Sequence, residues 1–177
     1  MEMMSKLFEN SEINGIELSN RFVRSATWEG MATDDGAVTP KLIETMVNLA
    51  NAGLDAIELS GGLRTSGKLS PSRAGINAED KEAYFKEDAR AFKNEINIPL
   101  ILVGGTRSFD VAERIVEEMV TDYISMSRPF IREPDLINRW KAGDRSKAKC
   151  KSDNLCFSPI FKGDGVYCVT KEHEKTE

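Results

Sequence analysis

Short apolar segments alternate with amphipathic ones along this 177-residue chain, and this alternation restricts the fold more than any other feature. Each apolar run predicts a strand, and each is followed by a segment with helical periodicity or helix-capping residues. The predicted strands are 21–26, 54–60, 99–104 and 122–127, and the predicted helices are 40–52, 81–96, 109–120 and 133–143. The order β α β α β α β α is typical of a parallel sheet covered by helices.

Local signals support several of these boundaries. Asn14 and Gly15 tolerate the positive φ angles of a tight turn, so we expect a hairpin near the start of the chain. Thr39 followed by Pro40 predicts a helix N-cap with proline at the first helical position. The polar stretch 63–80 is long enough to be a functional loop.

Composition narrows the classes of function. A net charge of −5 and a pI near 5.1 leave no broad basic surface, which disfavours nucleic acid as a partner. No apolar segment approaches the roughly 20 residues of a membrane helix, and the first residues lack the features of a signal peptide. We therefore expect a cytoplasmic protein that binds neither nucleic acid nor membranes.

The stretch LILVGGTRS, residues 100–108, predicts an anion site. Ligands of parallel α/β folds bind at the carboxyl ends of the strands, and this stretch covers such an end. Gly104 and Gly105 allow backbone N–H groups to face a ligand, and a helix capped by Ser108 adds unpaired N–H donors and a positive dipole end.

Ser127 and Arg128 occupy the equivalent position one strand later, in ISMSRPF. They offer a hydroxyl group and a fixed positive charge to the same anion, so the two loops together predict one phosphate site. In the alternative interpretation, the two glycines form a plain tight turn and Arg128 makes an ion pair with Glu133.

Longer strings resemble the Old Yellow Enzyme family of NADH:flavin oxidoreductases. LSNRFVRSATWEGMATDDGAVTPKLIE resembles the first strand and helix of that family. DAIELSGG, ILVGGTRS and DYISMSRPFIREPDLINRWKAGD resemble its last three barrel units. The resemblance implies FMN and NAD(P)H as ligands. It places Gly104, Gly105, Ser127 and Arg128 at the FMN phosphate, and Ala26 and Thr27 against the flavin ring.

The chain also departs from that family, whose members are about twice as long. An eight-stranded barrel requires roughly 250 residues, so residues 1–145 are expected to form an incomplete, roughly half TIM-type (β/α) barrel with four parallel strands. The resemblance implies that an internal block of about four βα units is missing, and in the family that block carries the catalytic residues. The catalytic residues are therefore left unassigned; the single histidine, His173, lies in a polar tail. Open sheet edges predict completion of the barrel by a homodimer or a higher homo-oligomer.

Residues 146–177 form a cysteine-containing C-terminal tail with Cys150, Cys156 and Cys168. The segment resembles the [4Fe–4S]-binding segment of longer relatives, but Asp153 stands where a second cysteine is expected. Because such clusters are held by four thiolates, we do not expect one here. We expect a vestigial, partly disordered tail with free thiols; zinc bound by the three cysteines and Asp153 is the weaker alternative.

Several functions are compatible with these observations. The first is an FMN-binding NAD(P)H:flavin oxidoreductase of doubtful catalytic competence. The second is a flavin- or phosphate-binding module without turnover, and the third is a remnant half-barrel that only assembles as an oligomer. A phosphosugar barrel enzyme is more distant, because no lysine lies at a strand end to form a Schiff base; Lys68 is inside the long loop.

Overall fold

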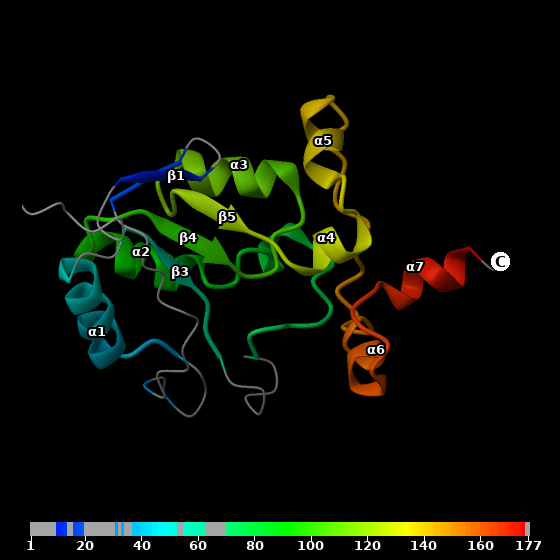
Figure 1. The fold of residues 1–177 in the computed structure, drawn as a ribbon, viewed down its shortest axis with the longest axis horizontal. Coiled ribbons are helices and arrows are strands. Elements are labelled where there is room, and N and C mark those ends of the chain that lie inside the picture. The colour runs from blue at the N-terminus through cyan, green and yellow to red at the C-terminus, as the bar shows by residue number, and fades with distance from the viewer. Residues whose placement is uncertain are drawn as a thin grey trace, which may run out of the picture.

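A parallel sheet with helices packed against it forms the centre of the molecule (Figure 1). The computed structural model describes residues 10–13, 16–19, 31, 33, 37–52, 55–62 and 70–175. Its strands are β1 (Ser11–Ile13), β2 (Ile16–Leu18), β3 (Ile57–Leu59), β4 (Leu100–Val103) and β5 (Tyr123–Ser125). Its α-helices are α1 (Pro40–Asn51), α2 (Lys86–Glu95), α3 (Phe109–Glu117), α4 (Arg128–Arg132), α5 (Leu136–Lys141), α6 (Phe157–Lys162) and α7 (Val169–Glu174). A short 3-10 helix spans Glu79–Lys81.

The sheet has the order β3-β4-β5, and both neighbouring pairs are parallel. This confirms the predicted α/β class, the parallel sheet and three of its strands. The predicted strand 21–26 lies outside the described residues. The predicted hairpin is confirmed by the antiparallel pairing of β1 with β2, although its turn residues, Asn14 and Gly15, are also outside them.

The two faces of the sheet differ in burial. Leu100 and Leu102 of β4 are fully buried, whereas Ile101 and Val103 are half-buried. The buried face packs against apolar residues of α1, α2 and α3, with Phe92 and Ile115 among them. A second cluster around Leu136 and Trp140 joins α5 to Ala148 of the tail. No helix in the described residues is long and apolar enough to cross a membrane.

Helix α1 begins as its sequence predicts. Thr39 has an extended backbone, and its side chain accepts a hydrogen bond from the N–H of Leu42, with Pro40 in the first turn. The Thr39 hydroxyl also donates to the carbonyl oxygen of Met31 at 2.6 Å. The cap thus satisfies a free amide and fixes the chain that enters the helix.

The start of α2 differs from the prediction. The expected helix 81–96 begins only at Lys86, because residues 82–85 are held in another conformation. Ala83 has a φ of 46°, and the N–H of Tyr84 donates to the carbonyl oxygen of Gly104 at 3.0 Å. Contacts with the tip of β4 therefore override local helix propensity here.

The chain after β5 contains more helix than predicted. Arg128, expected in a loop, is the first residue of α4, with Ser127 at its N-cap position and Pro129 in the first turn. The tail contains α6 and α7 and is described to residue 175, so the expected partial disorder is wrong for residues 146–175. Figure 1 shows α6 and α7 beyond α4, at the end of the molecule away from α1.

The two glycines after β4 have a packing role. Gly105 has a φ of 77°, and a Cβ atom there would lie 2.6 Å from Cε1 of Tyr84. Gly104 also has a positive φ, and a Cβ atom there would lie 3.1 Å from a ring carbon of Phe85. Bare backbone at this strand end therefore makes room for two aromatic rings.

Substitution of Gly105 measures this packing. We expect Gly105→Ala to lower the free energy of unfolding by about 2–4 kcal/mol, because it adds a ring clash to the cost of a positive φ. Gly143→Ala is the matched control: its φ is 99°, and a Cβ atom there would meet nothing within 4 Å. Denaturant unfolding should show a clearly smaller loss for the control; equal losses would contradict a role for Tyr84.

Candidate functional site

The carboxyl ends of β4 and β5 lie side by side. Val103 pairs with Ser125 across the parallel ladder, so the segments that follow both strands leave the sheet at the same edge. Between them is a cavity of about 220 Å³. Three of the predicted site residues, Gly105, Ser127 and Arg128, line it. The predicted convergence of the two strand ends is therefore present in the structure.

Other predicted site residues do not line this cavity. Gly104 precedes Gly105, and its carbonyl oxygen accepts a hydrogen bond from the N–H of Tyr84. Gly104 therefore holds the backbone of Tyr84, which lines the cavity. Ala26 and Thr27 lie outside the described residues. Their predicted contact with a flavin ring stays a prediction.

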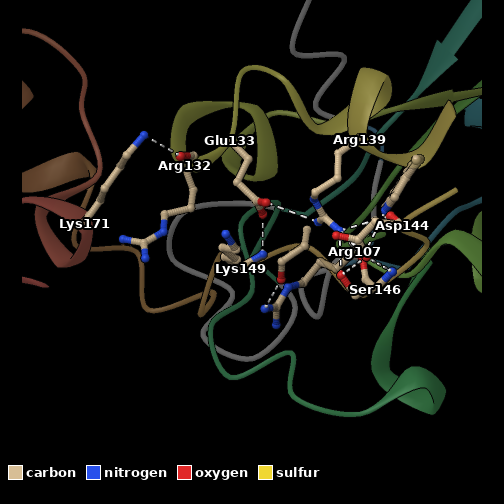
Figure 2. A network of polar contacts seen from close by, with 10 residues as sticks. Arg107, Arg132, Glu133, Arg139, Asp144, Ser146, Lys149 and Lys171 are labelled. Carbon is tan, nitrogen blue, oxygen red and sulfur yellow. Dashed lines mark hydrogen bonds and ion pairs between the residues drawn. The ribbon is translucent and has the colours of Figure 1, made fainter. Parts of the chain in front are cut away.

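Arg128 is held by neutral groups. One guanidinium nitrogen donates to the carbonyl oxygen of Arg73 at 2.9 Å and to Oδ1 of Asn154 at 2.5 Å. The alternative pairing with Glu133 is wrong, because Glu133 instead lies 3.1 Å from Arg139 (Figure 2). No carboxylate in the described part of the chain forms an ion pair with Arg128, so its charge is available to an anion.

Sequence reasoning missed Thr106, which also lines the cavity. Thr106 is 1% exposed, and its hydroxyl oxygen is buried without a hydrogen-bond partner. The signal was present in GGTRS, where a hydroxyl residue directly follows the two glycines.

The tail forms another part of the wall that was not predicted. Ser152 and Phe157 line the cavity, and the carbonyl oxygen of Ser152 accepts the N–H of Gly75 at 2.9 Å. The side chain of Asn154 donates to the carbonyl oxygen of Ser72 at 2.8 Å while it accepts from Arg128. The tail thus connects the loop at 72–75 to the arginine of the site.

A polar network fixes the start of the tail. Arg139 of α5 contacts Glu133, Asp144 and Ser146, and the backbone N–H of Lys149 donates to Glu133 (Figure 2). Farther along, Lys171 donates to the carbonyl oxygen of Arg132. These contacts join the tail to both α4 and α5.

The start of α3 carries an internal anion, which corrects one prediction. Glu82 is 1% exposed, and its Oε2 accepts the backbone N–H groups of Arg107 and Ser108, each at 2.8 Å. Ser108 occupies the N-cap position, but its hydroxyl donates to Glu82 instead of capping the helix. Two backbone N–H groups at the start of α3, those of Arg107 and Ser108, are therefore used by a carboxylate of the same chain.

The charge of Glu82 is well compensated. Burial by itself raises the pKa of Glu82, but the hydrogen bonds from Lys147, Ser108 and Arg107 outweigh it and leave the pKa below its usual range. Nζ of Lys147 lies 2.8 Å from the carboxylate. A carboxylate with a depressed pKa stabilises the fold above its unfolded-state pKa, and this contribution is lost as the pH falls through the folded-state pKa.

Removal of this charge should change both stability and its pH dependence. We expect Glu82→Gln to lower the free energy of unfolding at pH 7 by about 3 kcal/mol, since it leaves Lys147 without its buried partner. The decline in stability from about pH 6 to about pH 3 should be shallower than in the unchanged protein. Glu79→Gln, at an exposed glutamate, is the control and should change stability by less than about 0.5 kcal/mol. An E82Q protein with unchanged stability and pH slope would refute this role.

The cysteines are free thiols. Cys150 and Cys156 are buried, and burial raises the pKa of Cys156 although Arg128 opposes the shift. Asp153 accepts a hydrogen bond from Thr170 at 2.6 Å, which joins α7 to an earlier part of the tail. Within the described ranges, no three His, Cys, Asp or Glu side chains are grouped so that they would hold a metal ion.

Known proteins similar to this chain have the names of redox enzymes. The NADH oxidase of Thermoanaerobacter brockii is 30% identical over 174 residues, which cover 88% of this chain and 25% of that protein. An NADH-dependent flavin oxidoreductase of Talaromyces variabilis is 33% identical over 97 residues, which cover 52% of this chain and 23% of that protein. The 4,4'-dithiodibutanoate disulfide reductase of Rhodococcus erythropolis is 30% identical over 92 residues, which cover 52% of this chain and 22% of that protein.

The chain spans about a quarter of the length of these curated relatives. The predicted internal gap stays a prediction. No protein-family model matches the chain.

A solved structure agrees with the fold. The complex of 2-naphthoyl-CoA reductase with 2-naphthoyl-CoA matches with a TM-score of 0.57 and 24% identity, over 74% of this chain and 20% of that one. At this identity the match supports the fold alone. The names of the sequence relatives, NADH oxidase and NADH-dependent flavin oxidoreductase, support the resemblance of this chain to an Old Yellow Enzyme-like family.

Proposed function

We propose that this chain is part of an FMN-dependent NAD(P)H:flavin oxidoreductase and binds the phosphate end of FMN between the tips of β4 and β5. The observation that carries the proposal is Arg128, a cation without an acidic partner among the described residues, on the same cavity as Gly105 and Ser127. The names of the flavin oxidoreductase relatives support flavin and nicotinamide as ligands.

The size of the cavity suits a phosphate group better than a whole cofactor. Pockets that enclose complete small ligands usually measure about 300–1,000 Å³, and this cavity measures about 220 Å³. Its lining contains the hydroxyl groups of Ser72, Ser125, Ser127 and Ser152. Hydroxyl groups and an arginine suit a dianionic phosphate. The contact of the flavin ring with Ala26 and Thr27 stays a prediction from the resemblance.

Binding of FMN and catalysis of hydride transfer are separate functions. FMN supplies hydride transfer when it is bound, and protein groups position it and tune its surroundings. The described residues around the cavity provide positive charge and hydroxyl groups for binding, and we assign none of them a catalytic proton transfer. A binding module without turnover is therefore the second candidate function.

We also propose that the sheet is half of a TIM-type barrel completed by a second copy of the chain. Ile101 and Val103, on the face of β4 away from the packed helices, are only half-buried. Tyr123, which pairs with Ile101 on that same face, is 46% exposed. Symmetric pairing of two copies would cover this face and the strand edges together.

Cofactor binding is tested by the absorbance spectrum of protein purified without added flavin. We expect a flavin spectrum, and we expect Arg128→Ala to weaken FMN binding by about 2 kcal/mol through loss of a charge-assisted contact. Arg128→Lys should weaken it less. Arg90→Ala removes an exposed arginine that pairs with Glu118 and serves as the control. Equal affinities of R128A and R90A for FMN would remove the proposed site.

NADH turnover distinguishes the two candidate functions. Oxidation of NADH faster than by free FMN at the same concentration would support the oxidoreductase. FMN binding without such acceleration would support the binding module.

Light scattering tests the assembly. We expect a dimer or a higher oligomer at micromolar concentration, and Tyr123→Glu should shift the population toward monomer because it places a charge on the half-exposed face. Val116→Glu, at a 39% exposed position of α3, is the control. A stable monomer of the unchanged protein would exclude completion of the barrel by a second copy.

A further inference from the structure

Thr106 differs from the other buried hydroxyl residues near the sheet. Thr121 is equally buried, at 1% exposure, and its hydroxyl contacts the carbonyl oxygens of Leu100 at 2.7 Å and Tyr123 at 3.1 Å. In the described residues, Oγ1 of Thr106 is the only buried side-chain oxygen without a hydrogen-bond partner. Buried polar groups are nearly always satisfied, so an exception at a cavity points to a missing ligand atom.

The surroundings of Thr106 hold it firmly in place. It follows Gly105, whose backbone packs against Tyr84, and it precedes Arg107 and Ser108, whose N–H groups are bound to Glu82. Thr106 therefore joins a fixed glycine turn to a fixed helix start. A hydroxyl group held in this way is ready to bind without a further loss of conformational freedom.

Arg107 adds a second unpartnered donor. Its guanidinium donates to the carbonyl oxygens of Ile76 and Ala148, but its Nε is buried without a partner. Arg107 lines the same cavity as Thr106 and Arg128. Two consecutive residues thus carry unused donors at a site with an unneutralised cation.

We propose that the hydroxyl group of Thr106 donates a hydrogen bond to an oxygen of a phosphate monoester whose negative charge is neutralised by Arg128. The inference rests on the proposed function and deepens it, because it assigns a side chain outside the two predicted glycines to recognition of the phosphate. A neutral ligand of similar shape would leave this hydroxyl group without its acceptor.

The test compares Thr106→Val, Thr106→Ser and Thr121→Val in titrations with FMN, riboflavin and inorganic phosphate. For T106V we expect about tenfold weaker binding of FMN and of inorganic phosphate, since a hydrogen bond to a charged group is lost. Riboflavin, which has no phosphate, should bind T106V and the unchanged protein alike. T106S keeps the hydroxyl and should stay within about threefold of the unchanged protein.

Thermal unfolding of the ligand-free proteins supplies an independent readout. T106V should be at least as stable as the unchanged protein, because it removes an unpaired buried hydroxyl group. T121V should be less stable, because it removes a satisfied one, and yet it should bind FMN normally. These opposite patterns are expected only if the Thr106 hydroxyl serves a ligand.

Three results would overturn the inference. If the unchanged protein binds FMN and T106V binds FMN and phosphate equally well, the role of Thr106 fails while the proposed function stands. If T106V is destabilised and loses affinity for riboflavin as much as for FMN, its role is structural. If the unchanged protein binds neither FMN nor inorganic phosphate, the proposed function fails as well.

Discussion

The buried carboxylate of Glu82 is the contact on which the arrangement of the site depends. It joins three parts of the chain that are distant in sequence: the residues before α2, the start of α3 and Lys147 at the beginning of the tail. A single carboxylate satisfies two backbone N–H groups that would otherwise be unpaired at a buried helix start. The start of α3 is thus kept in place by a charge that the chain itself provides.

This use of Glu82 moves the proposed ligand contacts away from the helix start. With the N–H groups of Arg107 and Ser108 occupied, the groups that we propose for an anion are side chains on the cavity: Arg128, the serine hydroxyls and Thr106. The residues that follow β4 then have two separate roles. The glycines make room for Tyr84 and Phe85, and the threonine that follows them is one of the residues that line the cavity.

The sequence predicted those parts of the fold that local signals control. Thr39 and Pro40 marked the start of α1, and apolar runs marked β3, β4 and β5, because capping and burial act over a few residues. The convergence of Gly105, Ser127 and Arg128 followed from the topology of parallel strands. The predicted contacts of Ala26 and Thr27 lie outside the described residues.

Long-range contacts were beyond sequence reasoning. Helical periodicity extended α2 back to residue 81, but Glu82 is held by the N–H of Arg107 and Tyr84 by the carbonyl oxygen of Gly104, both distant in sequence. The alternative interpretation paired Arg128 with Glu133, whereas Asn154 and the Arg73 carbonyl are the groups that hold it. In each case a residue distant in sequence provides the partner, and no local pattern indicates it.

The contacts of the tail explain why this segment would persist even without any metal chemistry. Ala148 completes the cluster around Trp140, and Asn154 orients an arginine by way of its side-chain amide. Mutations that remove a cysteine would leave these contacts intact, whereas deletion of the segment would expose an indole ring and open one wall of the cavity. The segment therefore has an architectural role that does not require a metal ion.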